Sequence, residues 1–192
     1  MYYIMHRRNT VEELLATPQE YGIEVDIRSY GRRLIVHHDP FVDAVDFQEW
    51  IMHYSHRMLV LNIKEEGIEQ EVKAIVERKG IIDYFFLDLS FPALVKMVAA
   101  GEQRVGVRFS EYESLDTVMR FANRAGWVWV DYFKSMPMTD EIHGILAKNF
   151  KICLVSPELQ GHNPSLIQEI KHMLVHLSVD AICTKRPELW KK

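Results

Sequence analysis

The stretch Gly22-Ile23-Glu24-Val25-Asp26 places two carboxylates at the end of a short apolar run that favours a β-strand. Side chains alternate between the two faces of a strand, so Glu24 and Asp26 point to the same side. Two carboxylates at this spacing are a compact set of oxygen ligands for a hard divalent cation. Such a pair is also common at a solvated strand edge, so its meaning depends on the segments around it.

Three further segments repeat this arrangement within the first third of the chain. Short apolar runs lead into His6-Arg7, into His37-His38-Asp39-Pro40 and into Asn62-Ile63-Lys64. Histidine is the usual proton carrier near neutral pH, and arginine and lysine are the usual partners of phosphate. Alone, each segment has a structural explanation, such as a packed histidine or an Asp-Pro turn. Their shared position at strand ends favours hydrolysis of an anionic ester.

Composition limits the classes to which the protein can belong. A chain of 192 residues with 48% hydrophobic residues fits one domain, residues 1–192, with a substantial core. The net charge of −4 gives no indication of a nucleic-acid partner, and no apolar run is long enough to span a membrane. Cys153 and Cys183 lie in apolar runs without the spacing of a disulfide framework. We therefore expect a cytoplasmic protein with a small-molecule ligand.

Apolar runs and amphipathic segments alternate along the rest of the chain. Glycines, proline and capping residues mark the ends of these segments. One short helix is expected around residues 46–53, and a reduced helix at 187–190 closes the chain. The other expected helices are 68–78, 91–100, 114–125, 139–149 and 163–176, the last with Pro164 at its first position, and the expected strands are 84–88, 105–108, 127–131, 151–155 and 180–184.

Repeated strand-then-helix units imply parallel strands with right-handed crossovers. The chain supplies eight strands if residues 24–27 and 34–38 count as one extended unit. Eight such units close into a (β/α)8 TIM barrel, which would be compact and have short loops. An open, doubly wound sheet is the alternative, but the chain lacks its glycine-rich fingerprint. The sequence therefore favours an α/β barrel.

Polar side chains follow nearly every expected strand. Active sites of these barrels lie at the carboxyl ends of the strands, so such residues would share one rim. Any one of them could simply begin a polar loop. Asp88, Arg108 and Asp131 directly follow strongly apolar strands and are possible substrate contacts. The whole set is His6, Glu24, Asp26, Lys64, Asp88, Arg108, Asp131, Ser156, Glu158, Thr184 and Lys185.

The chain resembles the glycerophosphodiester phosphodiesterase family, within the phospholipase-C-like phosphodiesterase barrels. The resemblance lies in four segments, taken in family order: His6-Arg7 with Asn9-Thr10, 22–26, 34–40 and 180–187. It implies that His6 and His38 are the acid/base pair and that Glu24 and Asp26 bind a metal, usually Mg²⁺ or Ca²⁺. It also implies that Arg7 and Lys64 contact phosphate.

Three features depart from the family pattern. Arg8 stands where the family usually has glycine, which adds bulk and charge beside the site. Asn62 stands where the family has a third acidic metal ligand, and it can ligate only through its carbonyl oxygen. About 19 residues separate His38 from the next strand, so the usual inserted subdomain is missing. The site should therefore be more open than in the family.

The resulting hypothesis is a phosphodiesterase in which one histidine accepts a proton and the other donates one. Strand alternation from Val36 places His38 on the site face and His37 on the opposite face. Two alternatives remain open. One is a catalytically impaired barrel that binds a phosphorylated ligand. The other is a metal-assisted lyase or isomerase that acts on a phosphorylated sugar.

Overall fold

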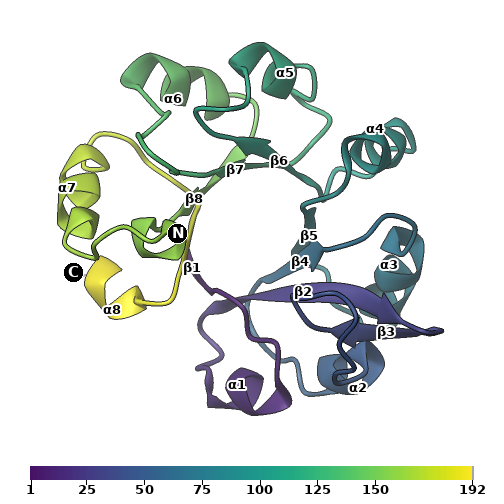
Figure 1. Cartoon of the computed structure of the whole chain (residues 1–192). Helices are drawn as coiled ribbons and strands as arrows, with labels where there is room; N and C mark the ends of the chain where they lie inside the picture. The colour runs from purple at the N-terminus through teal and green to yellow at the C-terminus, as the bar shows by residue number, and fades with distance from the viewer. Residues whose placement is uncertain (192) are drawn as a thin grey trace.

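The computed structural model describes residues 1–191 and shows a nearly closed barrel of eight parallel strands inside a ring of helices (Figure 1). Neighbouring strands follow the order β5-β4-β2-β1-β9-β8-β7-β6, and a bridge between Phe86 and Val105 joins β5 to β6. The expected (β/α)8 TIM barrel is confirmed. Its strands are β1 (Tyr2–Met5), β2 (Gly22–Tyr30), β4 (Leu59–Ile63), β5 (Tyr84–Leu87), β6 (Gly106–Phe109), β7 (Trp127–Val130), β8 (Lys151–Val155) and β9 (Ala181–Thr184).

The helices pack outside the barrel and are short. They are α1 (Val11–Ala16), α2 (Phe47–Met52), α3 (Glu69–Arg78), α4 (Phe91–Ala99), α5 (Leu115–Met119), α6 (Asp140–Leu146), α7 (Leu166–Met173) and α8 (Pro187–Trp190), with a 3-10 turn η1 (Pro157–Gln160). None of the helices within residues 1–191 is long and apolar enough to cross a membrane.

Several helices are shorter than the sequence predicts; α6, expected to reach Asn149, ends at Leu146. The prediction of a helix over 114–125 is wrong beyond Met119, where backbone N–H groups bond three residues back and form turns instead. The prediction that Pro164 opens a helix is also wrong. The Asn163 side chain accepts a hydrogen bond from the backbone N–H of Ser165, and the helix begins only at Leu166.

Helix α1 was not expected, although the sequence carries its signal. The Thr10 side chain accepts a hydrogen bond from the Glu13 backbone at 3.1 Å, and the Glu13 carboxylate accepts one from the Thr10 backbone at 3.1 Å. This reciprocal pair is a capping box, which a Thr-x-x-Glu pattern before an apolar run predicts. The box fixes the chain directly after His6-Arg7-Arg8.

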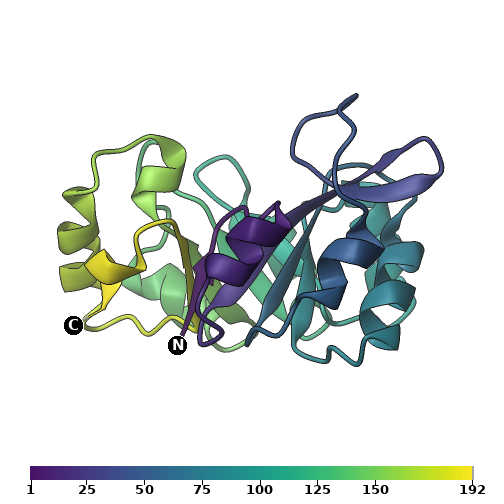
Figure 2. The same ribbon diagram turned by 90° about the horizontal axis from the view of Figure 1, so that it is seen from below.

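Strand β3 (Arg33–Val36) lies outside the parallel ring. It pairs antiparallel with the far end of β2, and the hairpin and the loop after it rise beyond the barrel (Figure 2, indigo and dark blue). Residues 24–27 and 34–38 thus form one unit, as expected. Because β3 ends at Val36, strand alternation does not extend to His37 and His38. Between β3 and β4 the chain forms only loops and α2, so no inserted subdomain covers the site.

The apolar core has two layers that follow from strand alternation. The barrel interior is filled by Ile4, Phe85, Trp127 and Trp129 among others, with the Phe85 and Trp127 rings stacked 4.7 Å apart. Cys153 and Cys183 are free, buried thiols within this inner layer. The intervening residues of each strand pack outward against the helices. The large aromatic side chains close the barrel below the carboxyl ends, so the polar residues there face a floored cavity.

Gly22 allows β1, β2 and β4 to approach closely at the start of β2. A Cβ atom at this position would lie 2.9 Å from Cγ1 of Ile4 and 3.2 Å from Cβ of Met58. Such a contact would push β2 away from both neighbours. The glycine therefore keeps β2 in the register that carries Glu24 and Asp26 into the barrel.

Candidate active site

The inward face of each strand changes from apolar to polar toward its carboxyl end. Ile4 is followed two residues later by His6, Val60 by Asn62, and Trp129 by Asp131. Because alternate residues share a face, these polar side chains lie above the inner aromatic layer. The β2–β4 register places Asp26 opposite Asn62. Alternation and register together thus assemble the polar rim.

Glu24 and Asp26 are completely buried and are held by hydrogen bonds. The Glu24 carboxylate accepts from the Asn62 amide at 2.8 Å and from the Arg7 backbone N–H at 2.7 Å. The Asp26 carboxylate accepts from the Asn9 amide at 2.8 Å, and its other oxygen lies 3.2 Å from Nζ of Lys64. The predicted metal ligands Glu24, Asp26 and Asn62 are therefore brought together.

The two buried carboxylates are poorly compensated. Burial, and then the charge of Asp26, raises the pKa of Glu24 to about 7, although hydrogen bonds from Asn62 and Arg7 act in the opposite direction. Two like charges in a site without water disfavour each other. An added cation would relieve this repulsion.

The donor set suits a hard cation that keeps some of its water. Within residues 1–191, Oδ1 of Asn62 and Oδ1 of Asp26 are buried and accept no hydrogen bond. Over the same residues, no group of three or more histidine, cysteine or acidic side chains is placed to hold a metal ion, so the candidate ligands are two carboxylates and one amide oxygen. Mg²⁺ commonly binds through one or two carboxylates together with waters and substrate phosphate. The residues present fit such an ion.

His6 lies at the rim beside the acidic pair. Its Nε2 is 3.8 Å from the Glu24 carboxylate, and its Nδ1 is buried without a hydrogen-bond partner among residues 1–191. Burial, and then the charge of Arg7, lowers the pKa of His6 to about 3. The ring is therefore neutral at physiological pH and can accept a proton.

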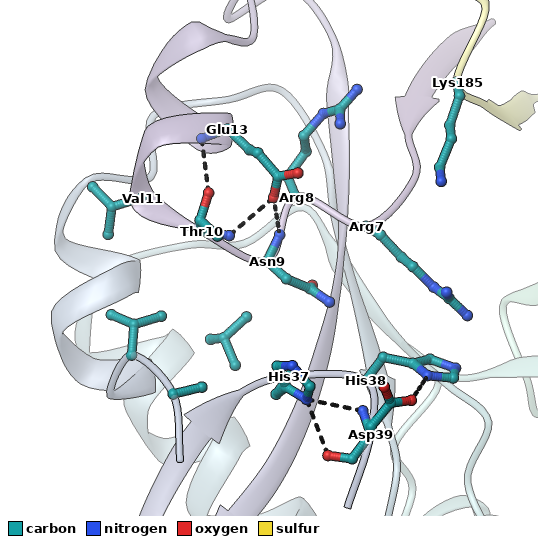
Figure 3. Close-up of a pocket in the computed structure, with 13 residues that line it drawn as sticks. Arg7, Arg8, Asn9, Thr10, Val11, Glu13, His37, His38, Asp39 and Lys185 are labelled. Atoms are coloured by element: carbon teal, nitrogen blue, oxygen red, sulfur yellow. Dashed lines mark hydrogen bonds and ion pairs between the residues drawn. The ribbon is translucent and has the colours of Figure 1, made fainter. Parts of the chain in front are cut away.

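His38 is oriented by its neighbour Asp39. Nδ1 of His38 lies 2.7 Å from the Asp39 carboxylate, and this hydrogen bond orients the ring (Figure 3). His38 lines both the barrel-mouth cavity and an outer groove, whereas His37 lines only the groove and bonds the Asp39 backbone. Asp39 was expected only as part of an Asp-Pro turn, although a carboxylate directly after a histidine indicates a partner for the ring.

Arg7 reaches the site through an uncommon backbone conformation. Its φ angle is 52°, in the left-handed region that residues with a Cβ atom seldom adopt. This turn directs its N–H to Glu24 and places its Nε 3.6 Å from the Asp26 carboxylate. Strain of this kind is common at functional sites.

A chain of ion pairs crosses the barrel mouth. Asp88, whose φ is 58°, lies 3.3 Å from Nζ of Lys64 and 2.6 Å from Nε of Arg108. Arg108 also binds Asp131, which accepts a further hydrogen bond from Gln160 at 2.8 Å. Burial raises the pKa of Asp131 to about 6, against the opposing effect of Arg108. The possible substrate contacts thus form one network, to which Gln160 adds a residue not expected from the sequence.

This network surrounds a cavity of about 300 Å³ that is also lined by His6, Arg7, His38 and Lys64.

The remaining polar strand ends have a different role. The Glu158 carboxylate accepts hydrogen bonds from Ser156, from Thr184 at 2.5 Å and from the Lys185 backbone at 3.1 Å. These bonds tie the ends of β8 and β9 together beside the cavity.

Comparison with known proteins identifies the fold. No family model and no curated protein matches the sequence. A glycerophosphodiester phosphodiesterase structure from Agrobacterium tumefaciens superposes with a TM-score of 0.70 at 15% identity, covering 98% of each chain. A glycerophosphoryl diester phosphodiesterase structure from Parabacteroides distasonis gives 0.67 at 13% identity, covering 98% of this chain and 84% of that one. This chain has the fold of those barrels. The resemblance read from the sequence is confirmed at that level.

Proposed function

We propose that the protein is a metal-dependent phosphodiesterase that cleaves a glycerophosphodiester or a related small phosphodiester. One observation carries the proposal: two histidines and two cationic side chains line the same cavity, beside a buried acidic pair. The histidines are His6 and His38, and the cations are Arg7 and Lys64. The shared fold with glycerophosphodiester phosphodiesterases supports this chemistry.

The histidines would divide the proton transfers between them. His6, which lines the cavity beside the acidic pair, would take the proton from the attacking hydroxyl of the substrate. His38, supported by Asp39, would donate a proton to the leaving alcohol oxygen. The attacking oxygen then forms the new bond to phosphorus as the leaving oxygen departs. The attacking hydroxyl lies on the alcohol that keeps the phosphate, next to its ester oxygen as in glycerol, so the other alcohol leaves and a cyclic phosphodiester forms. Water would then open the ring, with His38 taking a proton from the water and His6 returning one to the ring oxygen, and a phosphomonoester would be released.

Glu24, Asp26 and the carbonyl oxygen of Asn62 would hold the divalent cation, Mg²⁺ or Ca²⁺. When bound, the cation stabilises negative charge on the phosphoryl oxygens. Arg7 and Lys64 would contact the same phosphate, Arg7 with a planar fork and Lys64 as a point charge. Asp88, Arg108, Asp131 and Gln160 would hydrogen-bond the hydroxyls of the alcohol in the barrel mouth. We also propose that this small-molecule chemistry takes place in the cytoplasm.

The test is hydrolysis of a panel of glycerophosphodiesters, followed by ³¹P NMR, with Mg²⁺, with Ca²⁺ and with chelator. We expect release of a phosphomonoester that requires the metal and is lost in His6→Ala. A rate with chelator that equals the rate with Mg²⁺ or Ca²⁺ would contradict the proposed metal dependence. Tight binding of phosphorylated compounds without any turnover would instead identify an impaired barrel. Conversion of a phosphorylated sugar without hydrolysis would identify a lyase or isomerase.

A further inference from the structure

The outer groove beside the barrel mouth has a composition that the proposed reaction does not explain. It has a volume of about 790 Å³ and lies between the segment before α1 and the loop after β3 (Figure 3). Its cations are Arg7, Arg8 and Lys185, and its floor includes Val36 and Val45. Arg7 and His38 line both the groove and the cavity of the barrel mouth. A ligand that crosses the site can therefore enter both.

The acidic residues of the groove are engaged by local hydrogen bonds. Glu13 accepts from the backbone N–H groups of Asn9 and Thr10 at 3.0 and 3.1 Å, and Asp39 binds His38. Neither carboxylate pairs with Arg8 or Lys185, and no other acidic side chain within residues 1–191 does so. With three cations against these two carboxylates, the groove lining carries one surplus positive charge on a chain whose net charge is −4.

The cations of the barrel mouth behave differently. Lys64 and Arg108 are each held by two carboxylates. In the groove, Nε of Arg8 is buried without a hydrogen-bond partner among the described residues. A buried donor that is left unpaired is costly, and a ligand that accepts its hydrogen bond removes the cost.

The backbone holds these groove cations in place. The Arg8 N–H donates to the Glu24 carbonyl at 3.0 Å, and its carbonyl accepts from the Trp50 indole at 3.0 Å. The Lys185 N–H is fixed by Glu158 at 3.1 Å. In Figure 3 the Lys185 side chain extends toward Arg7, and Arg8 runs along the wall beside α1. The backbone of both residues is therefore fixed at the edge of the groove before a ligand binds.

We propose that the groove binds a second anionic group, a phosphomonoester, carried by one alcohol of the phosphodiester substrate. Arg8 and Lys185 are its specificity-determining residues. The substrate class is then a phosphodiester with its scissile phosphate at Arg7 and its second phosphate in the groove. This assignment rests on the proposed function for the scissile phosphate, but the binding of the second phosphate can be tested without turnover.

The first experiment is calorimetry with propane-1,3-diol monophosphate and bisphosphate at fixed pH and ionic strength. Two charge-assisted contacts predict that the bisphosphate binds wild type about tenfold more tightly or better. This ratio should approach one in Arg8→Gln/Lys185→Gln. The matched control is Arg32→Gln/Lys148→Gln, which removes two exposed charges elsewhere and should keep the ratio. Equal affinities in wild type, or a ratio unchanged by the groove variant, would overturn the proposal.

A second arm identifies the source of the phosphomonoester. Vesicles of phosphatidylcholine with and without phosphatidic acid present the same group on a lipid surface. We expect no sedimentation with either vesicle, because the groove binds a soluble substrate. Sedimentation that requires phosphatidic acid, Arg8 and Lys185 would overturn the soluble source and assign the groove to a lipid headgroup. If wild type prefers the bisphosphate but hydrolyses no diester, the second phosphate site is supported and the proposed phosphodiesterase function is refuted.

Discussion

The two rims of the barrel both carry ion-pair networks, but the networks differ in how completely they are satisfied. At the amino-end rim, Arg104 lies 2.8 Å from both Glu102 and Glu77, and Lys73 lies 2.7 Å from Glu102. Burial alone would raise the pKa of Glu102, but hydrogen bonds from Arg104 and Lys73 lower it to about 2. This network favours the charged form of its carboxylates.

At the carboxyl-end rim two carboxylates show the opposite shift, although, against the effect of burial, hydrogen bonds from Arg108 and Lys64 lower the pKa of Asp88. The pKa of Glu24 is raised to about 7 by burial and by Asp26, and that of Asp131 is raised by burial to about 6. Arg7 and Asp88 there adopt left-handed backbone conformations. The charge of Glu102 therefore stabilises the folded protein, whereas the charges of Glu24 and Asp131 destabilise it. Perturbed carboxylates and strain gathered at one end of a fold are typical of a binding site.

The largest effects should come from the two histidines of the carboxyl-end rim. His6→Ala or His38→Ala should each lower the phosphodiesterase rate by about 10²–10⁴-fold, the usual contribution of a positioned acid or base. The measurement is kcat/KM for the best diester of the panel. His37→Ala is the matched control and should cost far less, because His37 does not line the barrel mouth. If His37→Ala is inactive and His38→Ala is normal, the roles assigned to these histidines are wrong.

The next largest effect concerns the metal. Glu24→Gln or Asp26→Asn should lower the affinity for Mg²⁺, Ca²⁺ and Mn²⁺ about 10–100-fold, since a site with two carboxylates cannot spare either. Titration calorimetry measures this directly. Asp43→Asn, which removes an exposed carboxylate paired with Arg33, is the control and should bind metal as wild type does. Equal affinity in all four proteins would place the cation elsewhere on the rim.

The amino-end rim should respond in stability and not in rate. Glu102→Gln should lower the free energy of unfolding by about 2 kcal/mol at pH 7, because it breaks charge-assisted hydrogen bonds to Arg104 and Lys73. The folded pKa near 2 lies below the unfolded value of 4.5. The stabilisation is therefore fully present above about pH 4.5 and is lost as the pH falls toward 2.

Urea unfolding of wild type and Glu102→Gln across this pH range measures the difference. Glu71→Gln is the control, because Glu71 is exposed on α3 and makes no ion pair within residues 1–191. A difference between wild type and Glu102→Gln that stays constant down to pH 2 would show that Glu102 does not act through its charge.

The smallest expected effect is at Asn62. Asn62→Glu adds a third carboxylate beside Glu24 and Asp26 and should tighten Mg²⁺ binding several-fold in the absence of phosphate. The new carboxylate can also pair with Lys64, so the rate need not rise. Calorimetry without phosphate gives the affinity, and Asn62→Asp tests whether a shorter side chain reaches the ion. Unchanged affinity in both variants would place Asn62 outside the metal shell.

Much of the fold could be predicted because most strands contain a short apolar run, and β2 alternates apolar and polar residues. The ends of helices were harder to predict. After Met119, local hydrogen bonds form turns where the apolar pattern predicts that the helix continues, and before Leu166 they form turns where Pro164 predicts the first helical position. Helix α1 was missed, although the Thr-x-x-Glu pattern of Thr10 and Glu13 is a capping box that predicts it.

The site residues show the same difference between regular strands, which could be predicted, and irregular turns, which could not. His6, Asp26, Asn62 and Asp131 continue the inward face of their strands, so alternation alone places them. Other residues reach the site in ways that strand periodicity cannot show. Arg7 and Asp88 depend on left-handed backbone turns, and His38 and Gln160 depend on where loops fold back over the rim.

The contrast between the rims is tested most directly by removing one buried charge from each. The measurement is the free energy of unfolding in urea at pH 7 without metal, for Glu24→Gln and Glu102→Gln. Because the Glu24 charge is destabilising in the free protein, Glu24→Gln should be at least as stable as wild type while losing phosphodiesterase activity. Glu102→Gln should lose about 2 kcal/mol and keep its activity. A Glu24→Gln variant that loses as much stability as Glu102→Gln would contradict the account.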